Sequence, residues 1–189
     1  MLKQTKSYQI TNKDYSSKNL ADCSALRLIK NSNLDRSTFE SSQISKIQIK
    51  GSTMTKTNFR KCTMRKSHLS FSNFQKATLE WADLSENQFY RVNFDRANIQ
   101  CATLEGSQIS ECRLTKTDFS WSNLKNTKFI KSDLQGANFC HSDLEGTRFE
   151  DCKLRGALFN MNTRLPFSVE MAKSLGMQMV SLKIFDTIH

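Results

Sequence analysis

Residue types that could support catalysis are few and poorly arranged in this chain of 189 residues. The three histidines, His68, His141 and His189, form no HExxH and no nucleophile–base arrangement. Glycine-rich phosphate loops and CxxC spacings do not occur, and the pair Cys140-His141 is too small a ligand set for a metal ion. The sequence therefore predicts a protein that is not an enzyme and has no cofactor, metal or small-molecule substrate.

Positive charge is the second chemical feature. The chain carries 28 Lys and Arg against 18 Asp and Glu, a formal net charge of +10. Between residues 41 and 79 there are eight cations and no anion, whereas residues 101–160 are balanced, with eight of each sign. This asymmetry favours a polyanionic partner, such as nucleic acid, an acidic protein face or a lipid surface, unless the charge only keeps the protein soluble.

A five-residue repeat organises most of the chain. From Leu34 to Phe159, every fifth residue is Leu, Ile, Met or Phe, at all 26 positions. The other 104 residues of the segment 32–161 contain only five residues of these types. Neither an amphipathic helix nor an ordinary strand has this period.

A second register lies two residues before the first. It is Ala, Ser, Thr or Cys in 23 of 26 cases, the exceptions being Ile47, Asn87 and Val92. Residues two apart on extended backbone point to the same side, so each pentad buries one small and one large side chain. Because five is odd, the register survives only if the chain turns inward once per pentad and coils around a narrow axis. We expect Asn87 to bond buried backbone groups in this interior.

The pattern resembles the pentapeptide-repeat family, whose consensus is written A(D/N)LXX. Closely matching stretches are Ala82-Asp83-Leu84, Ala97-Asn98-Ile99, Ala137-Asn138-Phe139 and Ser142-Asp143-Leu144. The resemblance covers 130 of the 189 residues. It implies an all-β fold, a right-handed quadrilateral parallel β-helix with four pentads per coil and about 6.5 coils over residues 32–161.

The two ends differ from the repeat. We expect residues 1–31 to form an N-terminal cap and residues 162–189 to form a C-terminal cap, with a short helix after Ser168 that ends near Gly176, and then an extended tail. This C-terminal segment is similar to that of the quinolone-resistance pentapeptide proteins, in which it mediates dimerisation. The resemblance implies a homodimer, with these candidate contact residues: Phe167, Met171, Leu175, Met177 and Val180. The alternative is a helix that only covers the last coil of a monomer.

In the geometry that the resemblance implies, residues twenty apart stack in columns about 4.8 Å apart. One such column, which we call the basic ladder, consists of five cations: Arg36, Lys56, Lys76, Arg96 and Lys116. It is a candidate binding stripe for phosphate or carboxylate groups, and the alternative is a solvated surface.

The next column holds both tryptophans of the chain. We call it the aromatic ladder, and it consists of Trp81, Cys101, Trp121 and His141. Exposed Trp is enriched in interface hot spots, and bases of single-stranded nucleic acid also stack on such rings. The alternative is that the rings lie flat over neighbouring coils.

The remaining acids and thiols have structural explanations. Four aspartates directly precede large core residues and fit turns: Asp83, Asp118, Asp133 and Asp143. Three cysteines fall at small inward positions and act as small hydrophobes: Cys62, Cys112 and Cys152. Free buried thiols, the absence of an apolar run of about 18 residues and a polar N-terminus favour a cytoplasmic protein. The resemblance to the quinolone-resistance pentapeptide proteins implies a bacterial one. A secreted effector is the alternative for this family.

Three functions follow from these features. The first is a non-catalytic scaffold that presents a rigid surface to a protein partner. The second, implied by the family resemblance, is a topoisomerase-binding protein that protects DNA gyrase from quinolones; those relatives mimic DNA with an acidic surface, and the charge of +10 has the opposite sign. The third is electrostatic binding to nucleic acid or an anionic membrane.

Overall fold

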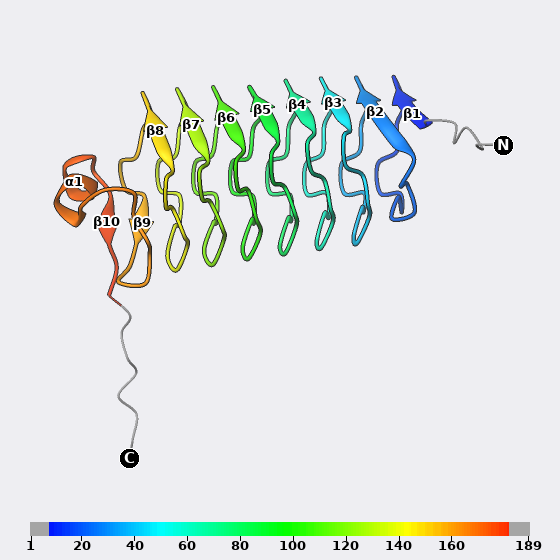
Figure 1. The fold of residues 1–189 in the computed structure, drawn as a ribbon. Helices are drawn as coiled ribbons and strands as arrows, with labels where there is room; N and C mark the ends of the chain where they lie inside the picture. The colour runs from blue at the N-terminus through cyan, green and yellow to red at the C-terminus, as the bar shows by residue number, and fades with distance from the viewer. Residues whose placement is uncertain (1–7, 182–189) are drawn as a thin grey trace, which may run out of the picture.

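The chain folds into a rod built from stacked coils (Figure 1). A computed structural model describes residues 8–181. Parts of the predicted caps, residues 1–7 and 182–189, lie outside the described residues. Eight short strands, one per coil, form a single parallel sheet in sequence order. These strands are β1 (Tyr8–Thr11), β2 (Leu26–Lys30), β3 (Gln48–Lys50), β4 (His68–Ser70), β5 (Gln88–Tyr90), β6 (Gln108–Ser110), β7 (Lys128–Ile130) and β8 (Arg148–Glu150).

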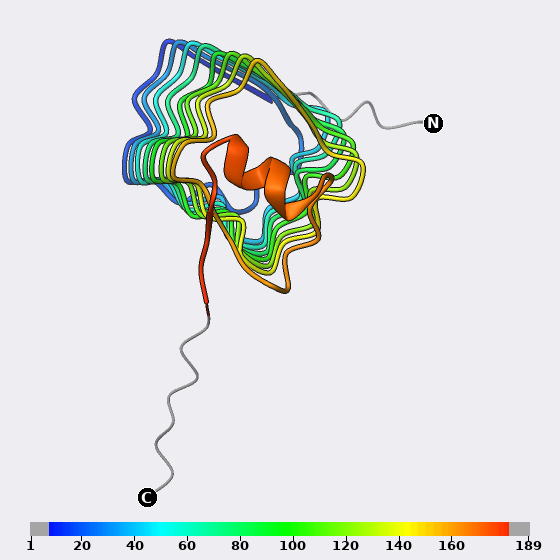
Figure 2. The same ribbon diagram turned by 90° about the vertical axis from the view of Figure 1, so that its left-hand side faces the viewer.

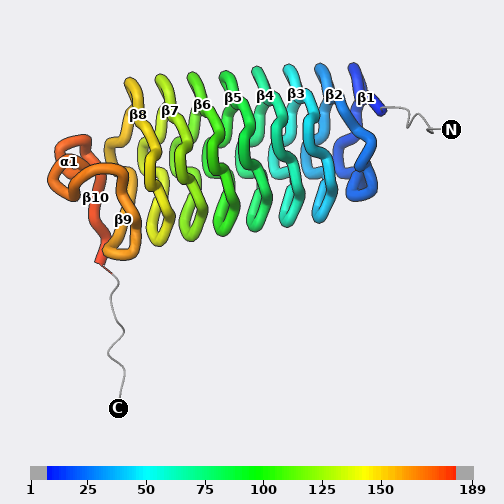
Figure 3. The backbone as a smooth tube through the Cα atoms, in the orientation of Figure 1, coloured from blue at the N-terminus to red at the C-terminus, as the bar shows by residue number. Residues whose placement is uncertain are grey.

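The register between coils is twenty residues throughout the repeat. Ile49 pairs with Leu69, Leu69 with Phe89, and isolated bridges on the other sides of the coil keep the same spacing as far as Leu158. Four pentads therefore make one coil, as the repeat predicts, and the parallel β-helix is confirmed. The tube drawing shows the coils in succession along the rod (Figure 3).

The predicted number of coils is too low. The sequence gives about 6.5 coils for residues 32–161, whereas the structure has about nine turns in all. The difference arises because the chain stacks on the repeat at both ends: residues 8–31 pair with it at the N-terminal end, and the bridge of Arg164 to Asp143 continues it at the C-terminal end. β1 pairs in parallel with β2, and β2 pairs in parallel with β3 of the repeat. In this first coil, however, Tyr8 lies opposite Leu26 and Asp14 lies opposite Asn33. These spacings of 18 and 19 residues break the five-residue register, which is why the sequence pattern does not reveal this coil.

The inward turn of each pentad comes from one backbone conformation. The residue two places after each large core residue, from 36 to 156, has a positive φ between 49° and 72°. This left-handed conformation turns the chain at the corner of the coil, and Gly occupies it at 51, 106, 136, 146 and 156. At the other corners from 36 to 156 it is held by residues with a Cβ, for which it is strained.

The interior is filled by the large residues of the register. Rings twenty residues apart stack in parallel, with centroids 4.9 Å apart for Phe39 and Phe59 and 5.3 Å for Phe119 and Phe139. Small inward residues bond the backbone of the previous coil: Thr57 Oγ1 donates to the Leu34 carbonyl at 2.7 Å. The coils thus satisfy one another's buried polar groups.

The C-terminal end is closed by a short helix. After β9 (Leu158–Phe159), α1 (Val169–Ser174) lies across the end of the rod, as the end-on view shows, and β10 (Gln178–Met179) pairs with β9 (Figure 2). Ser168 Oγ accepts a hydrogen bond from the Met171 amide at 3.2 Å. Ala172, a residue of the helix itself, is fully buried. Within residues 8–181, no helix is long and apolar enough to cross a membrane.

Candidate partner-binding surface

The basic ladder occupies one corner of the coil in five consecutive layers. All five of its residues are exposed, and all five have a positive φ. Within residues 8–181, Arg36, Lys56, Lys76 and Lys116 form no ion pair, and Arg96 lies 3.9 Å from Asp95. The predicted column therefore exists as a stripe of uncompensated positive charge, interrupted at one layer.

Asp95 explains that interruption. Burial opposes its ionisation, but hydrogen bonds from Thr115 and Gln75 and the charges of Arg113 and Arg96 lower the pKa of Asp95 below 3.8. The carboxylate is therefore ionised at neutral pH and offsets part of the charge of Arg96.

The aromatic ladder occupies the next corner. Trp81 and Trp121 have φ values of 60° and 63°, and 58% and 61% of their surfaces are exposed. Neither indole is buried against the neighbouring coils, as it would be if it lay flat over them. A bulky residue that is both strained and exposed contributes little to folding at this place.

The four members of the aromatic ladder are not equivalent. The Trp121 indole stacks on the His141 imidazole, with centroids 3.9 Å apart and planes 6° apart. His141 Nδ1 lies 3.3 Å from the Asn162 amide nitrogen, which holds the imidazole in place. Trp81 has no aromatic or cationic partner within residues 8–181. Cys101 lies between the two tryptophans and is half-buried.

Carboxylates surround Cys101. Burial and then the charges of Glu80 and Asp118 raise the pKa of the Cys101 thiol. Glu80 is paired with Arg60 at 3.4 Å, whereas Asp118 Oδ2 accepts a hydrogen bond from Gln100 at 2.7 Å. Within the described residues, no cation lies within ion-pair distance of Asp118. The protein is basic overall, but the surroundings of this aromatic pair are negative.

Another aromatic cluster was not predicted from the sequence. At the corner diagonally across the coil, Phe71 and Tyr90 pack edge to face at 5.3 Å. The Arg91 guanidinium lies 5.9 Å from the Phe71 ring and 5.1 Å from the Tyr90 ring, and it pairs with Glu111 at 2.7 Å. In the sequence, Phe71 is one of the few large apolar residues outside the core register, and this position could have identified the cluster. The two rings of this cluster already contact each other and Arg91, whereas Trp81 has no such contact within the described residues.

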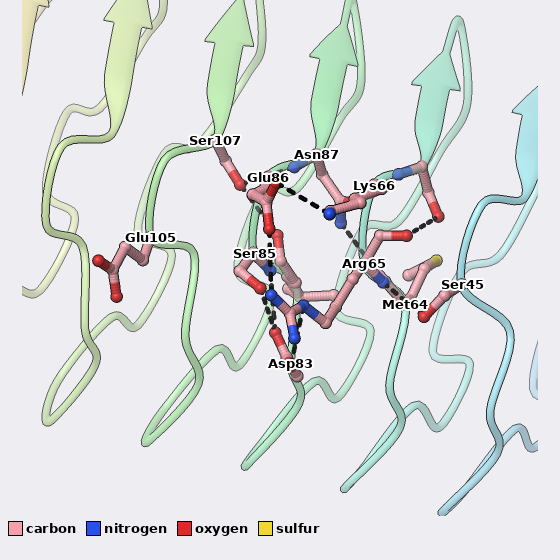
Figure 4. Close-up of polar contacts among 12 residues, drawn as sticks. Ser45, Met64, Arg65, Lys66, Asp83, Ser85, Glu86, Asn87, Glu105 and Ser107 are labelled. Carbon is pink, nitrogen blue, oxygen red and sulfur yellow. Dashed lines mark hydrogen bonds and ion pairs between the residues drawn. The ribbon is translucent and has the colours of Figure 1, made fainter.

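A network of ion pairs covers the side of the coil that follows the aromatic ladder. Arg65 contacts Asp83 at 3.5 Å and Glu86 at 3.0 Å, and Lys66 contacts Glu86 at 3.5 Å (Figure 4). A shallow hollow beside these residues extends to Glu105. Three of the four charged side chains that line it, Arg65, Asp83 and Glu86, are paired with one another. No group of three or more metal-ligating side chains occurs in residues 8–181.

Asn87 has the structural role that was expected. It is fully buried, its Nδ2 donates to the Met64 carbonyl at 2.7 Å, and its Oδ1 accepts from the Ser67 amide at 2.7 Å. Ser107, the next residue in this column, donates in the same way to the Leu84 carbonyl. The side-chain amide therefore replaces a hydroxyl group.

The C-terminal dimerisation candidates divide into two groups. Met177 is buried, and Phe167 packs against Phe149 with centroids 6.0 Å apart, so these two residues cover the last coil. Met171 and Leu175 are exposed, and Val180 is half-buried.

Comparisons with known proteins bear on the fold. A family model of pentapeptide repeats matches residues 54–86, 88–126 and 122–160, in eight copies. No curated protein matches the chain. Among solved structures, a trypsin-treated variant of QnrB1, a plasmid-mediated fluoroquinolone resistance protein, is similar with a TM-score of 0.60 and 14% identity over 92% of each chain. HetL, a pentapeptide repeat protein involved in heterocyst differentiation regulation in the cyanobacterium Nostoc, is 16% identical, with a TM-score of 0.46 over 82% of this chain and 75% of HetL. At such low identity the similarity to QnrB1 shows the fold alone.

Proposed function

The chain belongs to the pentapeptide-repeat family, and on this basis we propose that it is a non-catalytic scaffold that presents a rigid β-helical surface to a macromolecular partner. One observation carries the proposal. Trp81 and Trp121 are both exposed, and both occupy a left-handed corner at which Gly would be less strained. Since neither packing nor backbone geometry requires an indole there, contact with a partner explains it best.

The aromatic ladder is a better contact site than the other exposed aromatic residues. Phe71 is already covered by Tyr90 and Arg91, so a partner would gain less by binding it. Large exposed rings on a rigid frame lose little conformational entropy when they bind. The rod supplies that frame because each corner is fixed by hydrogen bonds to its neighbours.

Quantitative affinity capture from native cells tests the proposal. The double variant Trp81→Ala, Trp121→Ala is compared with the wild type and with Phe71→Ala, a matched change at the diagonal corner. The proposal expects at least one protein that the wild type and Phe71→Ala retain and the double variant loses. The same retained proteins for all three would contradict it.

A topoisomerase partner is a second candidate. The observation in its favour is the similarity in fold to QnrB1 over 92% of both chains. The charge of +10 opposes mimicry of DNA, and the register is unbroken between residues 33 and 158, with no inserted loop there. A gyrase supercoiling assay with a quinolone decides: restored supercoiling at stoichiometric protein supports this role, and no effect removes it.

Electrostatic binding to nucleic acid or an anionic membrane is a third candidate. The unpaired cations of the basic ladder favour it. Such binding must fall steeply with added salt, because it releases counterions. Gel-shift and vesicle-sedimentation measurements at two salt concentrations would support it by a large loss of binding at the higher one, and undetectable binding at the lower one would remove it.

We also propose that the C-terminal end supports a homodimer. The exposed side chains of Met171 and Leu175 line a hollow at the end of the last coil together with Phe149 and Phe167. Light scattering after size exclusion should give twice the mass of 21.7 kDa, and Met171→Glu should reduce it to that of one chain. A single-chain mass for the wild type would contradict the dimer.

A further inference from the structure

We infer that the gap between Trp81 and Trp121 binds the guanidinium group of an arginine side chain on a basic segment of a protein partner. The inference rests on the proposed function, because it names the chemistry of the partner that the aromatic ladder contacts. It is argued from the spacing of the rings, the residue between them and the charges around them.

The spacing fits a cation between two rings. Trp81 and Trp121 are two coils apart, and coils repeat at about 4.8 Å, so a group at the layer of Cys101 lies about 4.8 Å from each ring layer. A cation interacts with an aromatic face within about 6 Å of its centroid. A single inserted group can therefore contact both indoles.

The residue at the layer between the two tryptophans is Cys101. The His141 imidazole, one coil further along the rod, stacks on one face of Trp121, so the opposite face of this indole is the one left for a group at the Cys101 layer. At the diagonal corner, the residue next to Phe71 in its column is Arg91, whose longer side chain lies over the Phe71 ring. Cys101 is short and half-buried, so it forms the floor of the gap and leaves its centre free.

The charges next to the gap favour a cation over a phosphate. Glu80 and Asp118 are the two charged groups that raise the pKa of Cys101; Glu80 is paired with Arg60 at 3.4 Å, which leaves Asp118 as the free negative charge. Asp118 has no cation within ion-pair distance in the described part of the chain, although Gln100 and Asn138 donate to it at 2.7 and 3.1 Å. Its carboxylate is thus held in place and lacks an ionic partner. The basic ladder lies at the next corner, five residues away, and none of its cations is among the charges that shift the pKa of Cys101.

A guanidinium fits this combination better than an ammonium group. It is planar, it stacks on aromatic faces, and its fork of N–H groups matches a carboxylate. The same side chain already makes this type of contact elsewhere on the rod, where Arg91 lies over Phe71 and Tyr90 and pairs with Glu111. There, the chain supplies the arginine itself. At Cys101 the corresponding group must come from a partner.

The test is a titration of the full chain with labelled peptides, followed by anisotropy of the label and by tryptophan emission. The chain has two tryptophans, so its indole emission reports only on this gap. An arginine-rich peptide should quench the emission and bind more tightly than a lysine-rich peptide of equal length. Equal binding of both peptides would overturn the assignment to guanidinium.

Three variants make the test specific. Asp118→Asn should weaken binding of the arginine-rich peptide about tenfold, the effect of one charged hydrogen bond, whereas Asp133→Asn, the matched change on another side of the coil, should have no effect. Cys101→Arg should abolish binding because it places a guanidinium of the chain itself in the gap. The change fits the backbone, since Arg96 holds the same conformation with φ 55° against 56° at Cys101. Unchanged binding by Cys101→Arg would overturn the inference.

An oligothymidylate is titrated in parallel. Quenching by the oligonucleotide and not by the arginine-rich peptide would assign the gap to nucleic acid and refute the inference. If no peptide quenches but affinity capture still depends on Trp81 and Trp121, the scaffold function stands and this inference fails. If capture is also independent of the tryptophans, both fail.

Discussion

The indole of Trp121 and the imidazole of His141 stack in parallel with their centroids 3.9 Å apart, although the two residues are separated by twenty positions in the chain. The solenoid register brings them together at one corner of successive coils. The stack fixes the orientation of Trp121 while leaving 61% of its surface exposed. A fixed and exposed indole is suited to contact with a partner.

Removing the imidazole should release the indole. His141→Ala should shift the tryptophan emission to longer wavelength and lower the free energy of unfolding by about 1 kcal/mol, the usual value of an aromatic pair. Fluorescence and urea denaturation measure the two effects. His68→Ala serves as the control, since His68 is an exposed residue of β4 with no stacked ring. An unchanged emission spectrum for His141→Ala would show that the stack does not persist in solution.

Replacing Trp81 by Gly should not destabilise the fold. The residue has a φ of 60°, and Gly adopts this conformation without the cost of about 1 kcal/mol that a residue with a Cβ carries. We expect the free energy of unfolding of Trp81→Gly to be unchanged or higher by up to about 1 kcal/mol. Leu79→Ala, a change of a buried residue in the same coil, should instead lose about 2–5 kcal/mol. A large loss for Trp81→Gly in chemical denaturation would mean that the indole is structural.

Asn87 should be replaceable by Ser but not by Ala. Asn87→Ala leaves the Met64 carbonyl and the Ser67 amide without a partner, at an expected cost of about 2–3 kcal/mol. Asn87→Ser should cost less, because Ser107 in the same column bonds the Leu84 carbonyl with its hydroxyl group. Thermal and urea denaturation of the two variants gives the comparison. Equal losses would contradict the role assigned to the amide.

The buried thiols predict a loss of stability at alkaline pH. Burial raises the pKa of Cys62 and of Cys112 from 9.0 to about 12. Below pH 9 both states hold the protons and the thiols have no effect. Between about pH 9 and 12 only the unfolded chain releases them, so stability should fall by about 1.4 kcal/mol per pH unit for each thiol.

Serine variants isolate this effect from other ionisations. Buried serines already occupy the same columns: Ser42 and Ser122 lie in the column of Cys62, and Ser132 lies one coil after Cys112 in its column. Cys62→Ser and Cys112→Ser therefore fit the interior. The double variant should lose less stability than the wild type between pH 9 and 11. Parallel pH dependences for the two proteins would refute the assignment.

The sequence predicts the interior of this protein better than its surface. The register from Leu34 to Phe159 determines which residues are buried, because each pentad can turn only one large and one small side chain inward. The first coil cannot be predicted in this way, because its spacings of 18 and 19 residues leave no fixed period in the sequence. The columns of the two ladders follow from the period alone.

The function of each column depends on contacts between side chains, and these contacts cannot be predicted from the five-residue period. The stacking of Trp121 on His141 and the packing of Arg91 on Phe71 depend on rotamers. The negative surroundings of Cys101 depend on which carboxylates are paired. Within the described residues, Glu80 has Arg60, whereas Asp118 has only amide donors, from the side chains of Gln100 and Asn138 and the backbone of Ser120. The net charge of +10 therefore gave no indication of a negative site.

Photo-crosslinking in native cells tests most directly whether the aromatic ladder is the contact surface. Benzoylphenylalanine is placed at position 61, an exposed corner residue one coil before Trp81 in the same column, and separately at position 111, an exposed corner residue on the opposite side of the coil with the same left-handed backbone. The account predicts a discrete crosslinked product from position 61 and none from position 111. No product from position 61, or the same products from both positions, would contradict it.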